Sequence, residues 1–128
     1  MESSSKPAKR APSVVLLVSS RAERRAQMLR SCRTALPDCQ VETLNEFADL
    51  VHRLAGNGVA MVLLDLAGLP ELDEAAVLVL RGLGPHARLV AMQDDERTAS
   101  RPKLMVSDTV QFNQLGPWLG TLGRSNGT

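Results

Sequence analysis

One carboxylate stands out because it ends a long apolar run. Asp65 follows Val59-Ala60-Met61-Val62-Leu63-Leu64 and precedes the segment 66–70. A continuous apolar run of this length is typical of a strand buried on both faces of a parallel sheet. Open α/β sheets bind ligands at the carboxyl ends of their strands. Asp65 is therefore a candidate for chemistry or ligand binding. In its alternative, structural role its carboxylate would cap the following turn or accept backbone N–H bonds.

Three more carboxylates follow a later apolar segment. Asp94, Asp95 and Glu96 come directly after the run 88–92, and we expect them near the same sheet edge as Asp65. Carboxylates grouped in this way could hold a cation. The alternative is a solvated acidic loop, and on that interpretation we expect no metal site and no cofactor.

Arginines are concentrated between residues 21 and 33. The candidates for docking are Arg21, Arg25, Arg30 and Arg33, accompanied by Arg24. Spacings of three and four residues place side chains near one another on a helix. We expect a basic face opposite the apolar stripe, which would dock an acidic partner, a phosphate or a nucleotide. The alternative is a solvated helix face that Glu23 partly neutralises.

Apolar strands alternate with amphipathic helices along the chain. The predicted strands are 14–18, 40–44, 59–65, 88–92 and, more weakly, 109–112. The predicted helices are 21–36, 47–54, 71–83 and a last short one through 115–122, whereas 93–103 supports at best a short or distorted helix. This order predicts an α/β fold with a doubly wound, five-stranded parallel sheet, flavodoxin-like, with a weakened fourth helix.

Helix faces and caps follow from spacing and residue type. The first helix is predicted to bury Ala22, Ala26, Leu29, Cys32 and Leu36, the second Phe47, Leu50, Val51 and Leu54, and the third Leu72, Ala75, Ala76, Val79, Leu80 and Leu83. Ser19-Ser20 and Asn45 are the predicted N-caps. Cys39 lies near a strand start, where a disulfide with Cys32 is an open possibility.

Length and composition indicate one ordinary domain. The chain has 128 residues, a net charge of +1, no Tyr, two Phe and one Trp, which argues against nucleic-acid binding by charge or base stacking. We expect a disordered tail over 1–12, a domain over 13–123 and a frayed end over 124–128. No apolar stretch approaches the length of a membrane span. Two cysteines and no secretion signal favour the cytoplasm.

The sequence "MVLLDLAGLP" and the order of the elements resemble the receiver domain of bacterial response regulators. The resemblance covers residues 13–123 and places Asp65 at the phosphoacceptor position. It implies the receiver fold and a role in two-component, phosphorelay signal transduction. Pro70 falls one residue later than the proline of the family's loop.

Other functional positions of the family are not matched. Ser19-Ser20 stands where a pair of Mg²⁺-binding acids is found, Gln93 where a Thr or Ser is found, and "TVQFNQL" lacks the Lys. Phosphoryl transfer depends on cations that neutralise the moving charge. We therefore expect a pseudo-receiver, not an enzyme, that binds another signalling or regulatory protein independently of phosphorylation.

Three options stay open beside that expectation. The chain could form a homodimer through the fourth-helix and fifth-strand face. It could be a phosphoacceptor that uses Asp65 with an atypical metal site. It could also be a receiver variant that senses a cyclic dinucleotide through the arginines.

Overall fold

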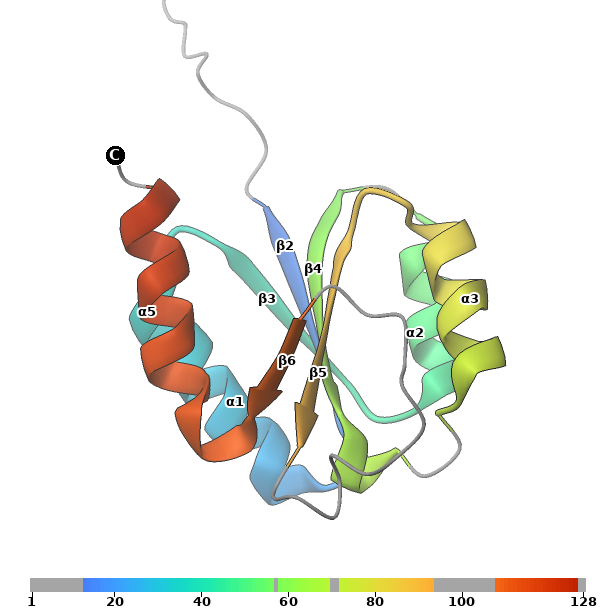
Figure 1. Cartoon of the computed structure of the whole chain (residues 1–128), viewed down its shortest axis with the longest axis horizontal. Helices are drawn as coiled ribbons and strands as arrows, with labels where there is room; N and C mark the ends of the chain where they lie inside the picture. The colour runs from blue at the N-terminus through green and yellow to red at the C-terminus, as the bar shows by residue number, and fades with distance from the viewer. Residues whose placement is uncertain (1–12, 57, 70–71, 94–107, 127–128) are drawn as a thin grey trace, which may run out of the picture.

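The chain folds around a five-stranded parallel sheet, as the sequence predicts. The computed structural model describes residues 13–56, 58–69, 72–93 and 108–126. The strands are β2 (Val14–Val18), β3 (Gln40–Leu44), β4 (Val59–Asp65), β5 (Arg88–Gln93) and β6 (Asp108–Gln111). Their order is β3-β2-β4-β5-β6 (Figure 1). The three central strands are the most apolar in sequence, which suits strands covered on both faces.

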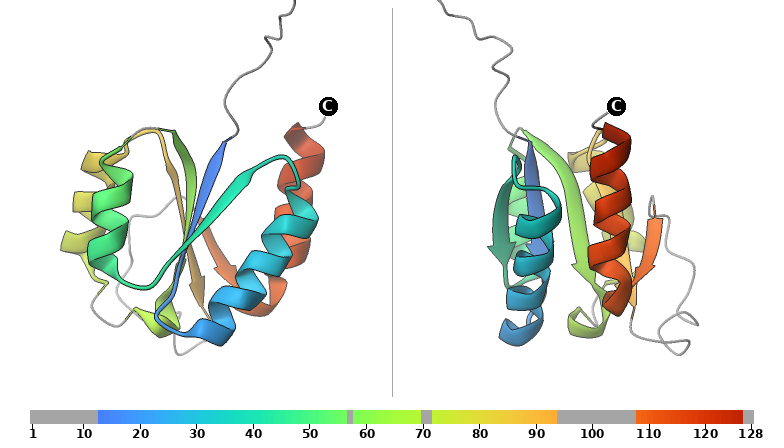
Figure 2. Two further views of the ribbon diagram at one scale, coloured as in Figure 1. Left: turned by 180° about the vertical axis from the view of Figure 1, so that it is seen from behind. Right: turned by 90° about the vertical axis from the view of Figure 1, so that its left-hand side faces the viewer.

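Helices cover both faces of this sheet. They are α1 (Ala22–Ala35), α2 (Phe47–Leu54), α3 (Glu74–Leu83) and α5 (Leu115–Asn126), with the 3₁₀ turns η2 (Leu66–Gly68) and η3 (Phe112–Gln114). Helices α1 and α5 lie together on one face, and α2 and α3 lie on the other (Figures 1 and 2). The arrangement is the doubly wound α/β fold expected from the alternating pattern.

Alternate residues of the central strands supply two hydrophobic cores. In β2, Val15 and Leu17 point into the core beneath α1 and α5, whereas Leu16 and Val18 point into the core beneath α2 and α3. Successive side chains of a strand face opposite sides of the sheet, so one apolar run serves both cores. The sheet edge that carries Asp65 is thus fixed from both faces.

Helix α1 buries a stripe that only partly overlaps the predicted one, because Cys32 is buried and Leu29 and Leu36 are partly buried as expected. Its buried residues are Met28 and Cys32, whereas Ala22 and Ala26 are exposed. The predicted serine cap is also wrong, because Arg21 is the N-cap and makes no side-chain capping bond. The helix is therefore rotated relative to the expectation, which brings the Arg24 position toward the sheet.

The boundaries and buried face of α3 also differ from the prediction. The helix begins at Glu74 instead of 71, where the Asp73 carboxylate accepts a hydrogen bond from the Ala76 N–H at 2.8 Å. Val77 and Leu80 are buried, but Val79 and Leu83, predicted to be core residues, are exposed. At the C-cap, a Cβ on Gly84 would lie 2.8 Å from Leu54 Cδ1, so glycine allows α3 to end close against α2.

The other boundaries follow the prediction more closely. Helix α2 buries Leu50 and Leu54 as expected, although its N-cap is Glu46 and not Asn45. Helix α5 continues to Asn126, through part of the expected frayed end. The fourth-helix segment falls from residue 94 onward outside the described residues, as does the expected tail 1–12.

Candidate functional site

Asp65 and Ser19 meet where two neighbouring strands end. Strands β2 and β4 pair with Val18 opposite Leu64, so the next residue of each chain segment lies at the same sheet edge. Both side chains are fully buried. The Ser19 hydroxyl donates to Asp65 Oδ2 at 2.8 Å and accepts from the Arg21 backbone N–H at 3.1 Å. The serine thus links the carboxylate to the start of α1.

Arg24 supplies the positive charge that this buried carboxylate requires. Its Nε donates to Asp65 Oδ2 at 2.6 Å and its Nη2 donates to Oδ1 at 2.8 Å. The Arg24 side chain is 16% exposed and that of Asp65 is 0% exposed. Two parallel N–H···O bonds from a planar guanidinium are a strong and directional way to hold a carboxylate. Both Asp65 oxygens are therefore occupied by groups of the chain itself.

The ring of Phe112 packs against the guanidinium of Arg24. Arg24 Cζ lies 3.8 Å from the ring centroid, within the range of a cation–π contact. Phe112 begins η3, directly after β6. The cluster of Ser19, Arg24, Asp65 and Phe112, called the Asp65 cluster below, thus joins the ends of β2, β4 and β6 to the first turn of α1.

This geometry opposes phosphoryl transfer to Asp65. A carboxylate nucleophile needs an accessible oxygen and a metal ion that neutralises the incoming phosphoryl group. Here one oxygen accepts from Arg24 and the other accepts from Arg24 and Ser19. Mg²⁺ requires charged oxygen ligands in an octahedral shell, and the neighbouring strand end supplies a serine hydroxyl. No group of three metal-ligating side chains occurs in the part of the chain that the structure describes.

One arginine of the predicted basic face is turned toward the sheet, and three of the others are exposed. Arg24, which the sequence placed on that face, points inward to Asp65. Arg25 Nη1 donates to the Ser19 carbonyl oxygen at 2.7 Å. Arg21, Arg30 and Arg33 are exposed.

The sequence pattern did not predict that Arg24 lies beside Asp65. Met28 and Cys32, the buried residues of α1, lie four and eight positions after it. Side chains four apart share a helix face, so a stripe drawn through Met28 would have placed Arg24 beside Asp65.

The remaining candidates do not join the Asp65 cluster. Asp94, Asp95 and Glu96 lie outside the described residues. Cys32 and Cys39 are both free thiols, so the structure shows no disulfide between them. Burial, with a smaller contribution from Cys39, raises the pKa of Cys32 to about 12.

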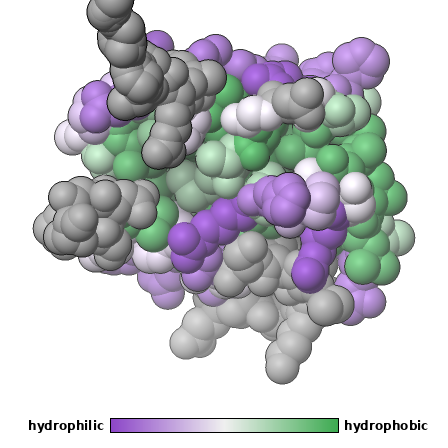
Figure 3. Space-filling view, turned by 90° about the horizontal axis from the view of Figure 1, so that it is seen from above, coloured by the Kyte–Doolittle hydropathy of each residue, from purple (hydrophilic) through white to green (hydrophobic). Residues whose placement is uncertain are grey.

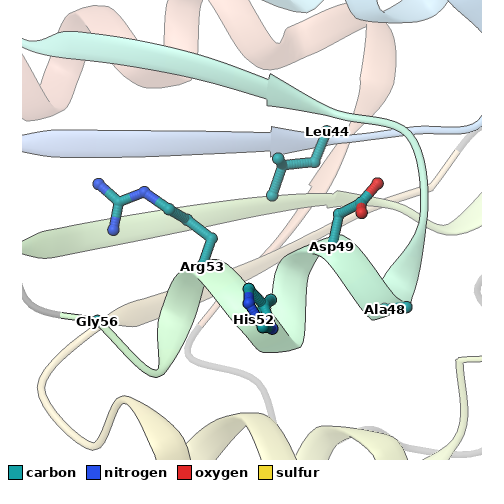
Figure 4. A pocket seen from close by; sticks show the side chains of 6 residues that line it. All are labelled: Leu44, Ala48, Asp49, His52, Arg53 and Gly56. Carbon is teal, nitrogen blue, oxygen red and sulfur yellow. The ribbon is translucent and has the colours of Figure 1, made fainter.

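A surface hollow of about 600 Å³ lies elsewhere, beside the C-terminal end of β3 (Figure 4). It is lined by Leu44, Ala48, Asp49, His52, Arg53 and Gly56. Arg53 extends along α2 toward the sheet edge, where it pairs with Glu42 at 2.8 Å. The hollow contains none of the predicted site residues.

Comparison with known proteins rests on structure alone. No protein-family model matches the sequence, and no curated protein sequence is similar enough to count as a relative. Among solved structures, a CheY-like receiver domain from Methylobacillus flagellatus is similar with a TM-score of 0.68 and 18% identity, over 88% of this chain and 99% of that one. The chain has the fold of a response-regulator receiver domain.

Two further structural neighbours have comparable scores. The receiver domain of AraT from Geobacillus stearothermophilus has a TM-score of 0.69 and 13% identity, covering 91% of this chain and 97% of that one. A putative pilus assembly protein, CpaE, from Burkholderia thailandensis has a TM-score of 0.63 and 21% identity, over 88% and 98% of the two chains.

Among the described helices, none is long and apolar enough to cross a membrane.

Proposed function

We propose that this chain is a phosphorylation-independent receiver module that acts by binding another protein in bacterial signalling or transcription regulation, without catalysis. The bidentate pair between Arg24 and the buried Asp65 carries the proposal. In this pair the guanidinium provides the compensating charge permanently, at the carboxylate that a phosphorylated receiver would modify. The domain therefore has one charge state at this site instead of two.

A permanent pair also removes the reason for a phosphorylation switch. A ligand or modification shifts a conformational equilibrium only by its differential interaction with two states. With Asp65, Ser19 and Arg24 joined by short hydrogen bonds, the strand ends are held without any added group. Regulation would then come from partner binding or protein abundance.

The exposed arginines of α1 are the proposed contact for the partner. Arg30 and Arg33 are exposed along α1, and Arg21 is exposed at its start. An acidic protein surface is the complementary chemistry for such side chains. The other surface considered from sequence, the fourth helix with the fifth strand, lies largely outside the described residues and does not enter the proposal. The cytoplasmic location stays a prediction.

The decisive experiment asks whether Asp65 accepts a phosphoryl group. The protein is incubated with acetyl phosphate and Mg²⁺ or Mn²⁺ and its intact mass is measured, with Asp65→Ala as the matched control and a phosphorylatable receiver as the positive control. We expect no mass gain for the wild-type chain. A gain of one phosphoryl group that Asp65→Ala abolishes would show a phosphoacceptor with an atypical metal site and overturn the proposal.

The cyclic dinucleotide option is tested by calorimetry. We expect no binding heat, because Arg25 already donates to the Ser19 carbonyl oxygen. Heat that disappears in Arg21→Ala/Arg25→Ala would identify a nucleotide sensor instead.

A further inference from the structure

The outer face of α3 exposes an unusual concentration of apolar side chains. Leu78 is 59% exposed, Val79 49% and Leu83 37%, and these are the large hydrophobic side chains that stand exposed in the described part of the chain. Ala75 and Gly82 are exposed on the same side of the helix. We call these five residues the α3 patch. In the view from above, apolar surface continues along the side where α2 and α3 lie (Figure 3).

The patch includes a glycine that the packing of this chain does not require. Gly82 lies in the last turn of α3, one residue before its end, and glycine is a poorer helix former than alanine. A Cβ built on Gly82 meets no atom within 4 Å, so the domain's own packing does not require glycine there. Ala75 lies seven residues earlier on the same stripe. Two small residues seven positions apart would let the backbone of another helix approach closely.

Opposite charges border the patch on one flank. Glu74 and Arg81 are also seven residues apart, and both are exposed. In an antiparallel pair of identical helices, each flank faces the same flank of the other helix. Glu74 of one copy would therefore lie near Arg81 of the second copy, and this contact would occur twice about the two-fold axis. Sliding one helix by two residues, about 3 Å, sets Ala75 opposite Gly82. The long side chains of Glu74 and Arg81 can span that offset.

We propose that the α3 patch binds the α3 patch of a second copy of this chain, with the helices antiparallel about a two-fold axis. Apolar surface, small residues near both ends of the helix and self-complementary charges all fit this one occupant. Large exposed apolar patches mark interaction sites in soluble proteins. The proposal is independent of the Asp65 cluster, which involves α1 and not α3.

The size of the patch predicts a weak dimer. A ten-residue helix is about 15 Å long, and stable dimers bury about 800 Å² on each partner. One helix supplies only part of that area. Association should therefore be weak and depend on protein concentration.

Charge reversal tests the orientation and the partner together. Sedimentation equilibrium is measured on the wild-type chain, on Glu74→Arg, on Arg81→Glu and on the double variant Glu74→Arg/Arg81→Glu. Each single variant should raise the dissociation constant about tenfold, because like charges then face each other. The double variant should recover most of the wild-type affinity, and an equal mixture of the two single variants should form mixed dimers.

Two substitutions within the patch complete the test. Leu78→Asp should abolish dimers, with Thr34→Asp, at an exposed position of α1, as the control. Gly82→Ala should raise the melting temperature of the monomer but weaken association, because the new methyl group meets only the second copy. A wild-type chain that stays monomeric to about one millimolar, or dimers that Leu78→Asp leaves intact, would overturn the proposal and assign the patch to a different partner or to none.

Discussion

Arg24 decides what Asp65 can do, because a buried carboxylate is tolerated only when a cation and hydrogen bonds compensate for lost water. The guanidinium meets both carboxylate oxygens, and Ser19 completes the set. Removing one member of such a pair leaves the other charge buried and unmatched. The residue that we propose to block phosphorylation should thus also be a determinant of stability.

We expect Arg24→Ala to lower the free energy of unfolding by about 3 kcal/mol, the lower end of the range for a broken buried pair, since Arg24 keeps some exposure. Arg24→Lys should cost less, because the charge remains but the bidentate bond is lost. Urea unfolding measures both, with the exposed Arg30→Ala as the control, expected within about 0.5 kcal/mol of wild type.

A double-mutant cycle separates the pair from general damage to α1. Arg24→Ala/Asp65→Ala should be less destabilised than the sum of the two single variants, because the double variant leaves no unmatched charge. If Arg24→Ala lowers the free energy of unfolding no more than Arg30→Ala does, the pair between Arg24 and Asp65 does not stabilise the fold.

The two cysteines should differ sharply in reactivity. A pKa of about 12 leaves roughly one Cys32 thiol in ten thousand as thiolate at pH 8, and that side chain is buried. Cys39 is only partly buried, although burial and Asp38 also raise its pKa. A disulfide-exchange reagent should modify one thiol per native chain and two in urea. Cys39→Ala should remove the native reaction, and Cys32→Ala should leave it; the reverse pattern would contradict the assignment.

At the scale of elements, strands were easier to predict than helix faces. Strand β4 is apolar at almost every position, so its burial on both faces could be inferred without knowing its neighbours. Helix α1 offers two stripes, and alanines at 22 and 26 made the wrong one look apolar. Alanine tolerates exposure and burial alike, and the two stripes overlap at Cys32, Leu29 and Leu36, so the sequence did not fix the rotation of the helix.

The buried face of helix α3 was equally hard to predict. Val77 and Val79 are equally apolar, and the sequence does not say which faces the sheet. An apolar stripe on the outer face of a helix has the same spacing as a core stripe, so the sequence pattern does not distinguish them. The predicted core residues Val79 and Leu83 are therefore part of the α3 patch. Only part of the Asp65 cluster could be predicted. The positions of Ser19 and Asp65 follow from the ends of the predicted strands, whereas the position of Arg24 depends on how α1 is rotated.

One ion pair between elements should make stability depend on pH. Arg53 of α2 donates to Glu42 of β3 at 2.8 and 3.1 Å and, by this hydrogen bonding, lowers the pKa of Glu42 below its ordinary value of 4.5. Because folding lowers the pKa of Glu42, the ionised pair stabilises the fold at pH values above the ordinary pKa. This contribution is lost as the pH falls through the lowered pKa.

The coupling between Glu42 and Arg53 should be about 0.5 kcal/mol at pH 7, typical of a partly exposed pair. It is measured by a double-mutant cycle of Glu42→Gln and Arg53→Gln in urea. As the pH falls below 4.5 and through the lowered pKa of Glu42, the coupling should decline toward zero. A coupling that grows on acidification would contradict the assigned pair.

For the whole molecule, one sheet carries two cores and should bind them into a single cooperative unit. Trp118 packs against the core beneath α1 and α5, whereas Leu80 is fully buried in the core beneath α2 and α3. Strands β2 and β4 contribute side chains to both. A substitution that destabilises one core should therefore also lower the unfolding midpoint of the other, because the cores share strands and small single domains unfold in an all-or-none transition.

Leu80→Ala should lower the free energy of unfolding by about 2–5 kcal/mol, the usual cost of removing a buried leucine side chain. Trp118 fluorescence and far-UV circular dichroism should report the same reduced urea midpoint, although the tryptophan lies across the sheet from the substitution. Leu78→Ala is the matched control, since it makes the same change on the same helix at a side chain that is 59% exposed. In dilute, monomeric protein it should change stability by no more than about 0.5 kcal/mol. A tryptophan transition that stays at the wild-type midpoint in Leu80→Ala would show two cores that unfold separately.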